Sequence, residues 1–128
     1  MIEVLKTKKK YALAINVVDG FTVEDEDYCE HLFQKKLDKG YKQINLLIRL
    51  DNLRLTKISL RAFMKDLYWI LRNYKRVGHM AIVAHSRIIK AWIRIDNLFF
   101  EKASAGRYER YFDVSEMKEA MAFIHARV

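Results

Sequence analysis

The amino-acid sequence predicts an α/β domain whose elements follow in the order β-β-α-β-α-β-α-β-α. Short runs of strand-forming residues alternate with amphipathic helical patterns, which favours parallel strands joined by right-handed crossovers. Only the first two strands are joined by a short polar segment, so we expect them to form a hairpin. With 128 residues the chain is long enough for one domain with a real core. We therefore predict a mostly parallel mixed sheet with an N-terminal hairpin, in a single domain spanning residues 1–128.

The hairpin comes first. Residues 2–6 alternate between apolar and polar side chains, and residues 11–18 are rich in strand formers. The polar segment from Thr7 to Lys10 joins them. Asp19-Gly20 then ends the second strand with residues that are typical of turns.

The first helix has clear ends. Thr22 is a good N-cap, and four acidic residues, 24–27, fill a first turn where negative charge suits the helix dipole. Because consecutive carboxylates on a helix point in different directions, we expect these acids to be solvated and not to bind a metal. Gly40 is expected to stop the helix.

The two central strands are predicted at residues 43–50, a nearly continuous apolar run, and at residues 80–84. Such runs are typical of parallel strands that are covered on both faces. Ligands of open α/β sheets usually bind beyond the carboxyl ends of the strands. Here those ends are residues 51–59 and 85–87.

A helix follows each central strand. Thr56 or Ser59 can cap the first of these helices, which has apolar residues at spacings of three and four and is expected to end at Gly78. Ser86 is expected to cap the second, which covers residues 86–101.

The last two elements are an edge strand and a helix. Residues 107–112 alternate charged and aromatic side chains less regularly, as an exposed edge strand does. Asp113 or Ser115 is expected to cap the final helix.

The segment 86–101 is more apolar than a one-sided surface helix requires. Its apolar arc covers about 220°, roughly twice the stripe that such a helix needs. Its Trp92 side is expected to face the sheet, which leaves a smaller patch for a ligand or a second subunit. The patch consists of Ile89, Ile93, Asp96 and Phe100. Trp69, on the side of its helix that carries arginines, is a further candidate contact residue.

Composition limits the class of protein. The chain is 52% hydrophobic and 31% charged, and its net charge is +8. The charge is spread out, only residues 8–10 form a basic run, and no nucleic-acid-binding motif accompanies them, so we do not expect a nucleic-acid partner. No apolar run is long enough for a membrane span, and no signal peptide is visible, so we expect a cytoplasmic protein. Cys29 is the single cysteine and is expected to be a small buried residue.

The sequence does not assemble a catalytic site. Its four histidines lack metal-ligand spacing, and the isolated glycines form no phosphate loop. His85 lies at the carboxyl end of a strand beside Ser86, but a serine that caps a helix explains this pair without catalysis. We therefore expect a non-enzymatic protein with no cofactor and no metal.

Several stretches give the chain a family resemblance. The opening IEVL, the segment LLIRLDN…FMKDLYWILRNYKRVGHMAIVAHS and the ending RYFDVSEMKEAMAFI resemble small bacterial SpoIIAA-like proteins of the STAS and CRAL-TRIO type. The resemblance covers residues 2–126. It implies a SpoIIAA-like fold and two kinds of function.

The first implied function is binding of an apolar or lipid-like ligand between helices and sheet, which the segment 86–101 suits; the same segment suits a homodimer. The second is that of an anti-sigma-factor antagonist, which is phosphorylated on a serine and binds a protein partner. Ser59 or Thr56 lies near the corresponding position, but the Asp and Gly of that family's phosphorylation motif are absent here.

Overall fold

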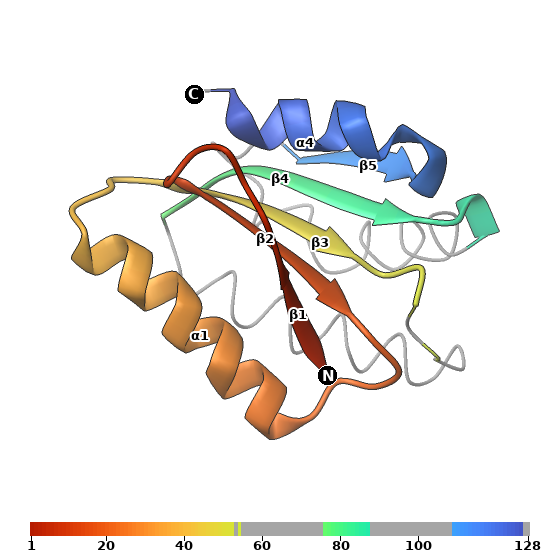
Figure 1. Ribbon diagram of the computed structural model, residues 1–128, viewed down its shortest axis with the longest axis horizontal. Coiled ribbons are helices and arrows are strands. Elements are labelled where there is room, and N and C mark those ends of the chain that lie inside the picture. The colour runs from red at the N-terminus through yellow and green to blue at the C-terminus, as the bar shows by residue number, and fades with distance from the viewer. Residues whose placement is uncertain (53, 55–75, 88–108, 127–128) are drawn as a thin grey trace.

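Five strands form one mixed sheet in the part of the chain that the structure, a computed structural model, describes: residues 1–52, 54, 76–87 and 109–126. They lie in the spatial order β1-β2-β3-β4-β5. β1 is antiparallel to β2, and all other neighbours are parallel (Figure 1). The strands are β1 Ile2–Leu5, β2 Ala12–Val17, β3 Ile44–Arg49, β4 Val77–Ala84 and β5 Glu109–Asp113. The predicted mixed sheet with an N-terminal hairpin is confirmed.

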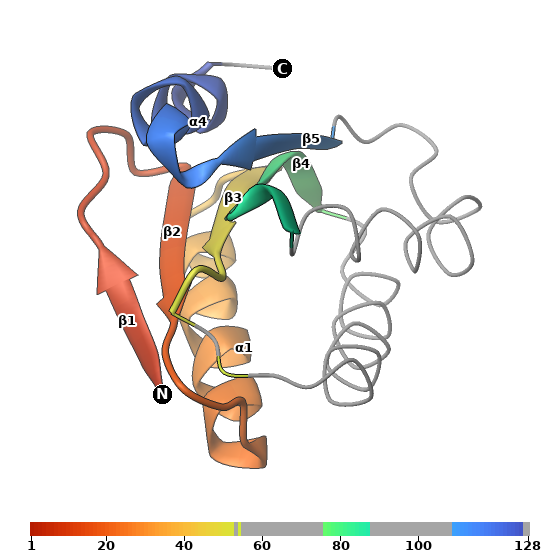
Figure 2. The same cartoon turned by 90° about the vertical axis from the view of Figure 1, so that its right-hand side faces the viewer.

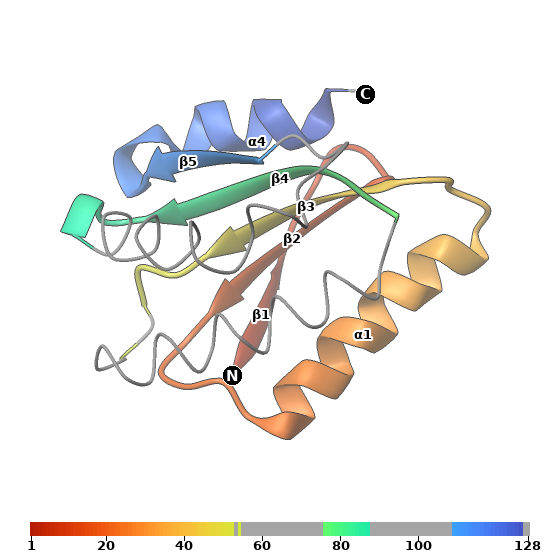
Figure 3. The same cartoon turned by 180° about the vertical axis from the view of Figure 1, so that it is seen from behind.

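The described helices cover opposite faces of this sheet. The long helix α1 (Val23–Asp38) lies on one face, and α4 (Met117–His125) lies on the other (Figures 2 and 3). A single 3-10 turn, η1 (Val114–Glu116), leads from β5 into α4. Among the described helices, none combines the length and the apolar character that crossing a membrane would need.

Alternate side chains of the central strands feed two separate cores. The core on the side of α1 is built from large aliphatic residues of β2, β3 and β4 together with Phe33. The core under α4 contains several alanines, namely Ala12, Ala14, Ala81 and Ala120. Small residues let a helix approach a sheet closely. The alanines therefore explain how α4 packs directly on the middle of the sheet.

β4 carries one extra residue relative to β3. Ile44 pairs with Val77, but Leu46 pairs with Met80, so three residues of β4 span the distance of two in β3. Gly78 lies in this bulge, where a residue without a side chain is common. The prediction that Gly78 ends a helix and that the strand starts at residue 80 was therefore wrong. The local sequence gave a glycine stop signal, whereas strand pairing extends β4 back to Val77.

The side chain of Asn45 closes the gap that the bulge leaves. Its Oδ1 accepts a hydrogen bond from the backbone N–H of His79 at 2.9 Å. Its Nδ2 donates to the carbonyl oxygens of Ile124 at 2.9 Å and Ala126 at 2.8 Å. Asn45 is 3% exposed. A buried amide is stabilising when its oxygen and both of its N–H groups are hydrogen-bonded, because each unpaired group would carry its full desolvation cost.

The ends of α1 agree with the sequence prediction. Thr22 and Asp25 form a capping box, in which the Thr22 hydroxyl accepts from the Asp25 N–H at 3.1 Å and the Asp25 carboxylate accepts from the Thr22 N–H at 2.9 Å. At the other end Gly40 has a φ of 95° and donates its N–H to the Leu37 carbonyl at 2.9 Å.

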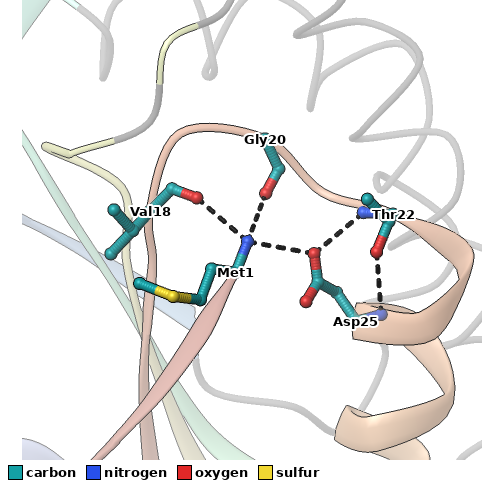
Figure 4. Close-up of polar contacts among 5 residues, drawn as sticks. All are labelled: Met1, Val18, Gly20, Thr22 and Asp25. Atoms are coloured by element: carbon teal, nitrogen blue, oxygen red, sulfur yellow. Dashed lines mark hydrogen bonds and ion pairs between the residues drawn. The ribbon is translucent and has the colours of Figure 1, made fainter.

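The same carboxylate holds the start of β1. The Met1 ammonium donates to Asp25 at 3.0 Å, to the Val18 carbonyl at 3.0 Å and to the Gly20 carbonyl at 2.9 Å (Figure 4). Partial burial raises the pKa of Asp25, but the hydrogen bonds from Thr22 and from the ammonium outweigh it, so the pKa is lowered. Asp25 thereby ties the edge strand to the first turn of α1.

Cys29 is partly buried on α1, with an unreactive thiol. Burial raises its pKa to about 12, and the nearby Asp25, Glu26 and Glu30 carboxylates add to this. The thiol therefore stays protonated at neutral pH, as a packing residue rather than a nucleophile.

We predict that Asn45→Leu lowers the free energy of unfolding by about 2–4 kcal/mol, because it leaves the His79 N–H and two carbonyl oxygens without partners. The measurement is urea unfolding followed by circular dichroism. Gln43→Leu, an exposed position just before β3, is the control and should change stability by less than about 0.5 kcal/mol. Equal effects of the two substitutions would contradict the role of Asn45.

We also predict that Asp25→Asn lowers the free energy of unfolding by about 1 kcal/mol at neutral pH. The folded pKa of Asp25 is lowered, so its contribution is fully present above the unfolded pKa of about 3.9 and is lost as pH falls through the folded pKa. Urea unfolding at neutral pH and near pH 2–3 should show the difference between the two proteins shrink in acid.

Glu24→Gln, at an exposed first-turn acid, is the matched control for the Asp25 experiment. Its effect on stability should be smaller at neutral pH. A difference between wild type and Asp25→Asn that persists unchanged in acid would show that the carboxylate charge is not involved.

Candidate functional site

The carboxyl ends of the parallel strands carry a group of polar side chains, which we call the carboxyl-edge cluster. It consists of Asn16, Arg49, Asp51, Asn52 and His85. Asn16 pairs in register with Arg49 across β2 and β3, and His85 follows the last residue of the neighbouring strand β4. The cluster lies at the edge where the sequence predicts a ligand.

Arg49 and Asp51 form the central ion pair of this cluster. Arg49 donates from Nε to Oδ1 of Asp51 at 2.5 Å, and its terminal nitrogen donates to Oδ2 at 3.0 Å. The Asp51 side chain is only 9% exposed. The hydrogen bond from Arg49 lowers the pKa of Asp51 despite partial burial, and it raises the pKa of Arg49. The pair is therefore ionised at neutral pH, with both carboxylate oxygens occupied.

Asn16 joins the cluster to the edge strand. It is buried in β2, where its Nδ2 donates to the Glu3 carboxylate at 3.2 Å. Its Oδ1 accepts from the side-chain amide of Asn52 at 3.5 Å. The turn after β2 is also tied to the turn after β3, since the Asp19 N–H donates to the Asn52 carbonyl at 3.0 Å. These bonds hold the turns that follow β2 and β3 together.

Asp113 ends β5 beside the same edge. Its carboxylate accepts from the Ser115 N–H at 2.9 Å and from the Ser115 hydroxyl at 2.6 Å. These hydrogen bonds lower the pKa of Asp113. The electrostatic interaction with His85 and a hydrogen bond from the Ser86 backbone lower it further by smaller amounts. Asp113 is a cap, but of the 3-10 turn that precedes α4. The final helix itself begins after Glu116, which makes no side-chain capping bond, so the prediction that Asp113 or Ser115 caps that helix was wrong.

The described carboxylates at this edge are ionised at neutral pH. Asp51 and Asp113 both have lowered pKa values, so neither holds a proton to donate at neutral pH. His85 is exposed, and it lies close enough to Asp51 and Asp113 to lower the pKa of both carboxyl groups slightly. Within the described ranges, no group of His, Cys, Asp and Glu side chains is arranged to hold a metal ion.

The residues that the sequence singled out lie outside the described part of the chain. They are Thr56, Ser59, Trp69, Ile89, Ile93, Asp96 and Phe100. Of the segment 86–101 the structure describes only Ser86 and Arg87, which are helical and exposed. The helix begins after His85 and already includes Ser86, so its start agrees with the prediction at residue 86, although Ser86 lies within the helix rather than at its cap.

Two members of the cluster, Asn16 and Arg49, were not identified from the sequence. Each interrupts an otherwise apolar strand, and in a strand covered on both faces such a polar residue signals a partner at the sheet surface. The β1–β2 register brings Glu3 to Asn16, and the turn after β3 brings Asp51 to Arg49.

The SpoIIAA-like family model matches residues 12–125, which include all the described elements except β1. The chain belongs to the SpoIIAA-like family. Separate comparisons with curated proteins and with solved structures found no match. The family and fold expectations are thereby confirmed, whereas a ligand or partner for this member of the family is a matter for experiment.

We predict that Arg49→Gln raises the pKa of the Asp51 carboxyl, because the substitution removes the charged donor that holds the carboxylate ionised. An NMR titration of the Asp51 side-chain carbon measures this directly. Arg54→Gln is the control, since Arg54 is exposed and lies 3.7 Å from Asp19 instead. If the pKa of Asp51 is the same in wild type and Arg49→Gln, Arg49 is not what stabilises the carboxylate.

Proposed function

We propose that this SpoIIAA-like chain is a non-enzymatic binding module that holds a small apolar or lipid-like ligand, self-associates through segment 86–101, or does both. The observation that carries the proposal is the path of the chain after the carboxyl end of β4. The strand β4, buried except at His79, is followed at the carboxyl edge by His85 and then by helical Ser86 and Arg87. The segment 86–101, which is more apolar than a one-sided surface helix requires, therefore starts at the edge where α/β sheets bind their ligands.

The composition of that segment supports a covered surface. Its apolar arc of about 220° exceeds what one sheet face covers, and large exposed apolar patches on soluble domains commonly mark binding sites. Ile89, Ile93 and Phe100 form the surplus patch, with Asp96 among them.

The carboxyl-edge cluster supports binding over catalysis. The Asp51 and Asp113 carboxylates are engaged by Arg49 and Ser115 within the chain. Such bonds fix the shape of the edge, which favours recognition of a partner by a rigid surface.

We predict that Ile93→Asp abolishes ligand retention or self-association, because a charge in the surplus patch makes covering it unfavourable. Two measurements check this on protein purified from its host: mass spectrometry of an organic extract, and light scattering at high concentration. Asn97→Asp adds the same charge on the polar stripe of the segment and should leave both results as in wild type. Urea unfolding shows whether each variant is folded.

The proposal fails if the wild-type protein carries no apolar molecule in repeated preparations and is also a strict monomer. If Asn97→Asp loses binding as well as Ile93→Asp, the change in net charge explains the loss, and the patch does not.

The alternative proposal is an anti-sigma-antagonist-like regulator that is switched by phosphorylation at Ser59 or Thr56 and binds a protein partner. Its support is positional: the segment with these hydroxyls follows β3, whose outlet lies beside that of β4 at the same edge. A phosphate at a helix N-terminus is electrostatically favourable. The intact mass of the same native preparation tests it, and absence of a phosphorylated species under all growth conditions counts against it.

A further inference from the structure

A basic groove lies at the amino end of the sheet, opposite the carboxyl-edge cluster. It has a volume of about 600 Å³ and lies between the β1–β2 connection and one face of α4. Figure 2 shows this connection beside α4. Lys6 and Lys8 line the groove from the connection, and Lys118 lines it from the helix. No acidic side chain is among the lining residues.

None of these three lysines forms an ion pair with a described residue, and all three are exposed. Three ammonium groups around one groove repel one another, so an anion between them would be favoured. The volume is in the range that small-molecule sites occupy.

The negative end of α4 does not cancel this charge. The last carbonyl groups of a helix normally present partial negative charge. Here the Phe123 carbonyl accepts from the His79 ring at 3.0 Å, and Asn45 donates to the Ile124 carbonyl at 2.9 Å. The Tyr11 hydroxyl donates to the His125 carbonyl. The sheet thus satisfies the carbonyls that would otherwise oppose an anion.

His125 adds a polar group with a defined protonation state. The backbone N–H of Lys8 donates to its Nε2 at 3.2 Å, which places the ring proton of the neutral form on Nδ1. Partial burial lowers the pKa of His125, and the charges of Lys8 and Lys9 lower it further. His125 is therefore neutral at neutral pH, and the imidazole does not add to the local repulsion.

The remaining lining is partly apolar. Met121 and Ala122 lie between Lys118 and His125 on the same face of α4, at spacings of three and four residues. The groove thus combines an apolar wall with three cations.

We propose that this groove binds a phosphate monoester whose organic part rests against Met121 and Ala122. A phosphate monoester carries between one and two negative charges at neutral pH and accepts several hydrogen bonds, which matches three ammonium donors better than a single carboxylate does. The proposal is independent of the site on segment 86–101.

Phenyl phosphate is the probe, since it joins an apolar ring to a phosphate monoester. Titrated into the full chain and followed by amide NMR, it should shift Lys8, Lys118 and His125. Lys8→Gln and Lys118→Gln should each weaken binding about fivefold or more. Lys39→Gln removes the same charge from the exposed end of α1 and should change the affinity less than twofold. Inorganic phosphate should bind more weakly than phenyl phosphate.

The ring of His125 gives a second readout. The charged or titrating groups near it are Lys6, Lys8 and Lys9 on the connection, Lys118 on α4 and Tyr11 at the start of β2. A bound dianion offsets the lysines, so saturation with phenyl phosphate should raise the pKa of His125 in an NMR titration. The rise should be absent in a Lys8→Gln/Lys118→Gln double variant.

A second arm identifies the source of the phosphate. Sedimentation with phosphatidylcholine vesicles, with and without phosphatidate, tests a lipid phosphate. Binding of phosphatidate vesicles alone, lost in the double variant, supports the same groove with a lipid headgroup as its ligand.

The proposal is overturned if neither phenyl phosphate nor phosphatidate binds. It is also overturned if Lys39→Gln weakens binding as much as Lys8→Gln does, or if a random oligonucleotide competes as strongly as phenyl phosphate, since either result indicates general attraction to a basic surface.

Discussion

The buried amide of Asn45 connects the three elements on which the arrangement of the sheet depends. It fills the bulge of β4 by accepting from His79, and it holds the end of α4 through two carbonyl groups. Without it the bulge would lose the hydrogen bond to the His79 N–H, and the C-terminal turn of α4 would be held only by the His79 ring, the Tyr11 hydroxyl and apolar packing. Because the donors and the acceptor all have partners, the amide stabilises one packing of the helix on the sheet rather than several.

The two ends of the sheet carry different charged groups, because different connections of the chain meet at each end. At the carboxyl end, Arg49 and Asp51 neutralise each other, and Asn16 is hydrogen-bonded to Glu3 of β1 and to Asn52 in the turn after β3. At the amino end, the β1–β2 connection brings lysines next to α4 without an acidic partner among the lining residues. The two ends of the sheet therefore differ in charge among the described residues: the main ion pair lies at the carboxyl end, and three exposed lysines line the groove at the amino end.

The sequence predicted the strands and helices more successfully than their exact limits or the site contacts. Thr22 and Gly40 function at the ends of α1 as predicted, because capping depends on local backbone and side-chain chemistry. Gly78 was misassigned because a glycine at a helix end and a glycine in a bulge look alike along the chain. Arg49 was missed because its partner Asp51 is recognised only when the turn after β3 is known.

What the sequence by itself determined is the α/β order and the N-terminal hairpin, together with the family to which the chain belongs. The order and the hairpin follow from periodicity and local signals, which each segment carries alone, and the family follows from the match over residues 12–125. The tertiary structure decided the bulge in β4, the bridging role of Asn45 and the meeting of Lys8 with His125. These contacts join residues far apart in the chain, and only the pairing of strands and the docking of α4 bring such residues within hydrogen-bond distance.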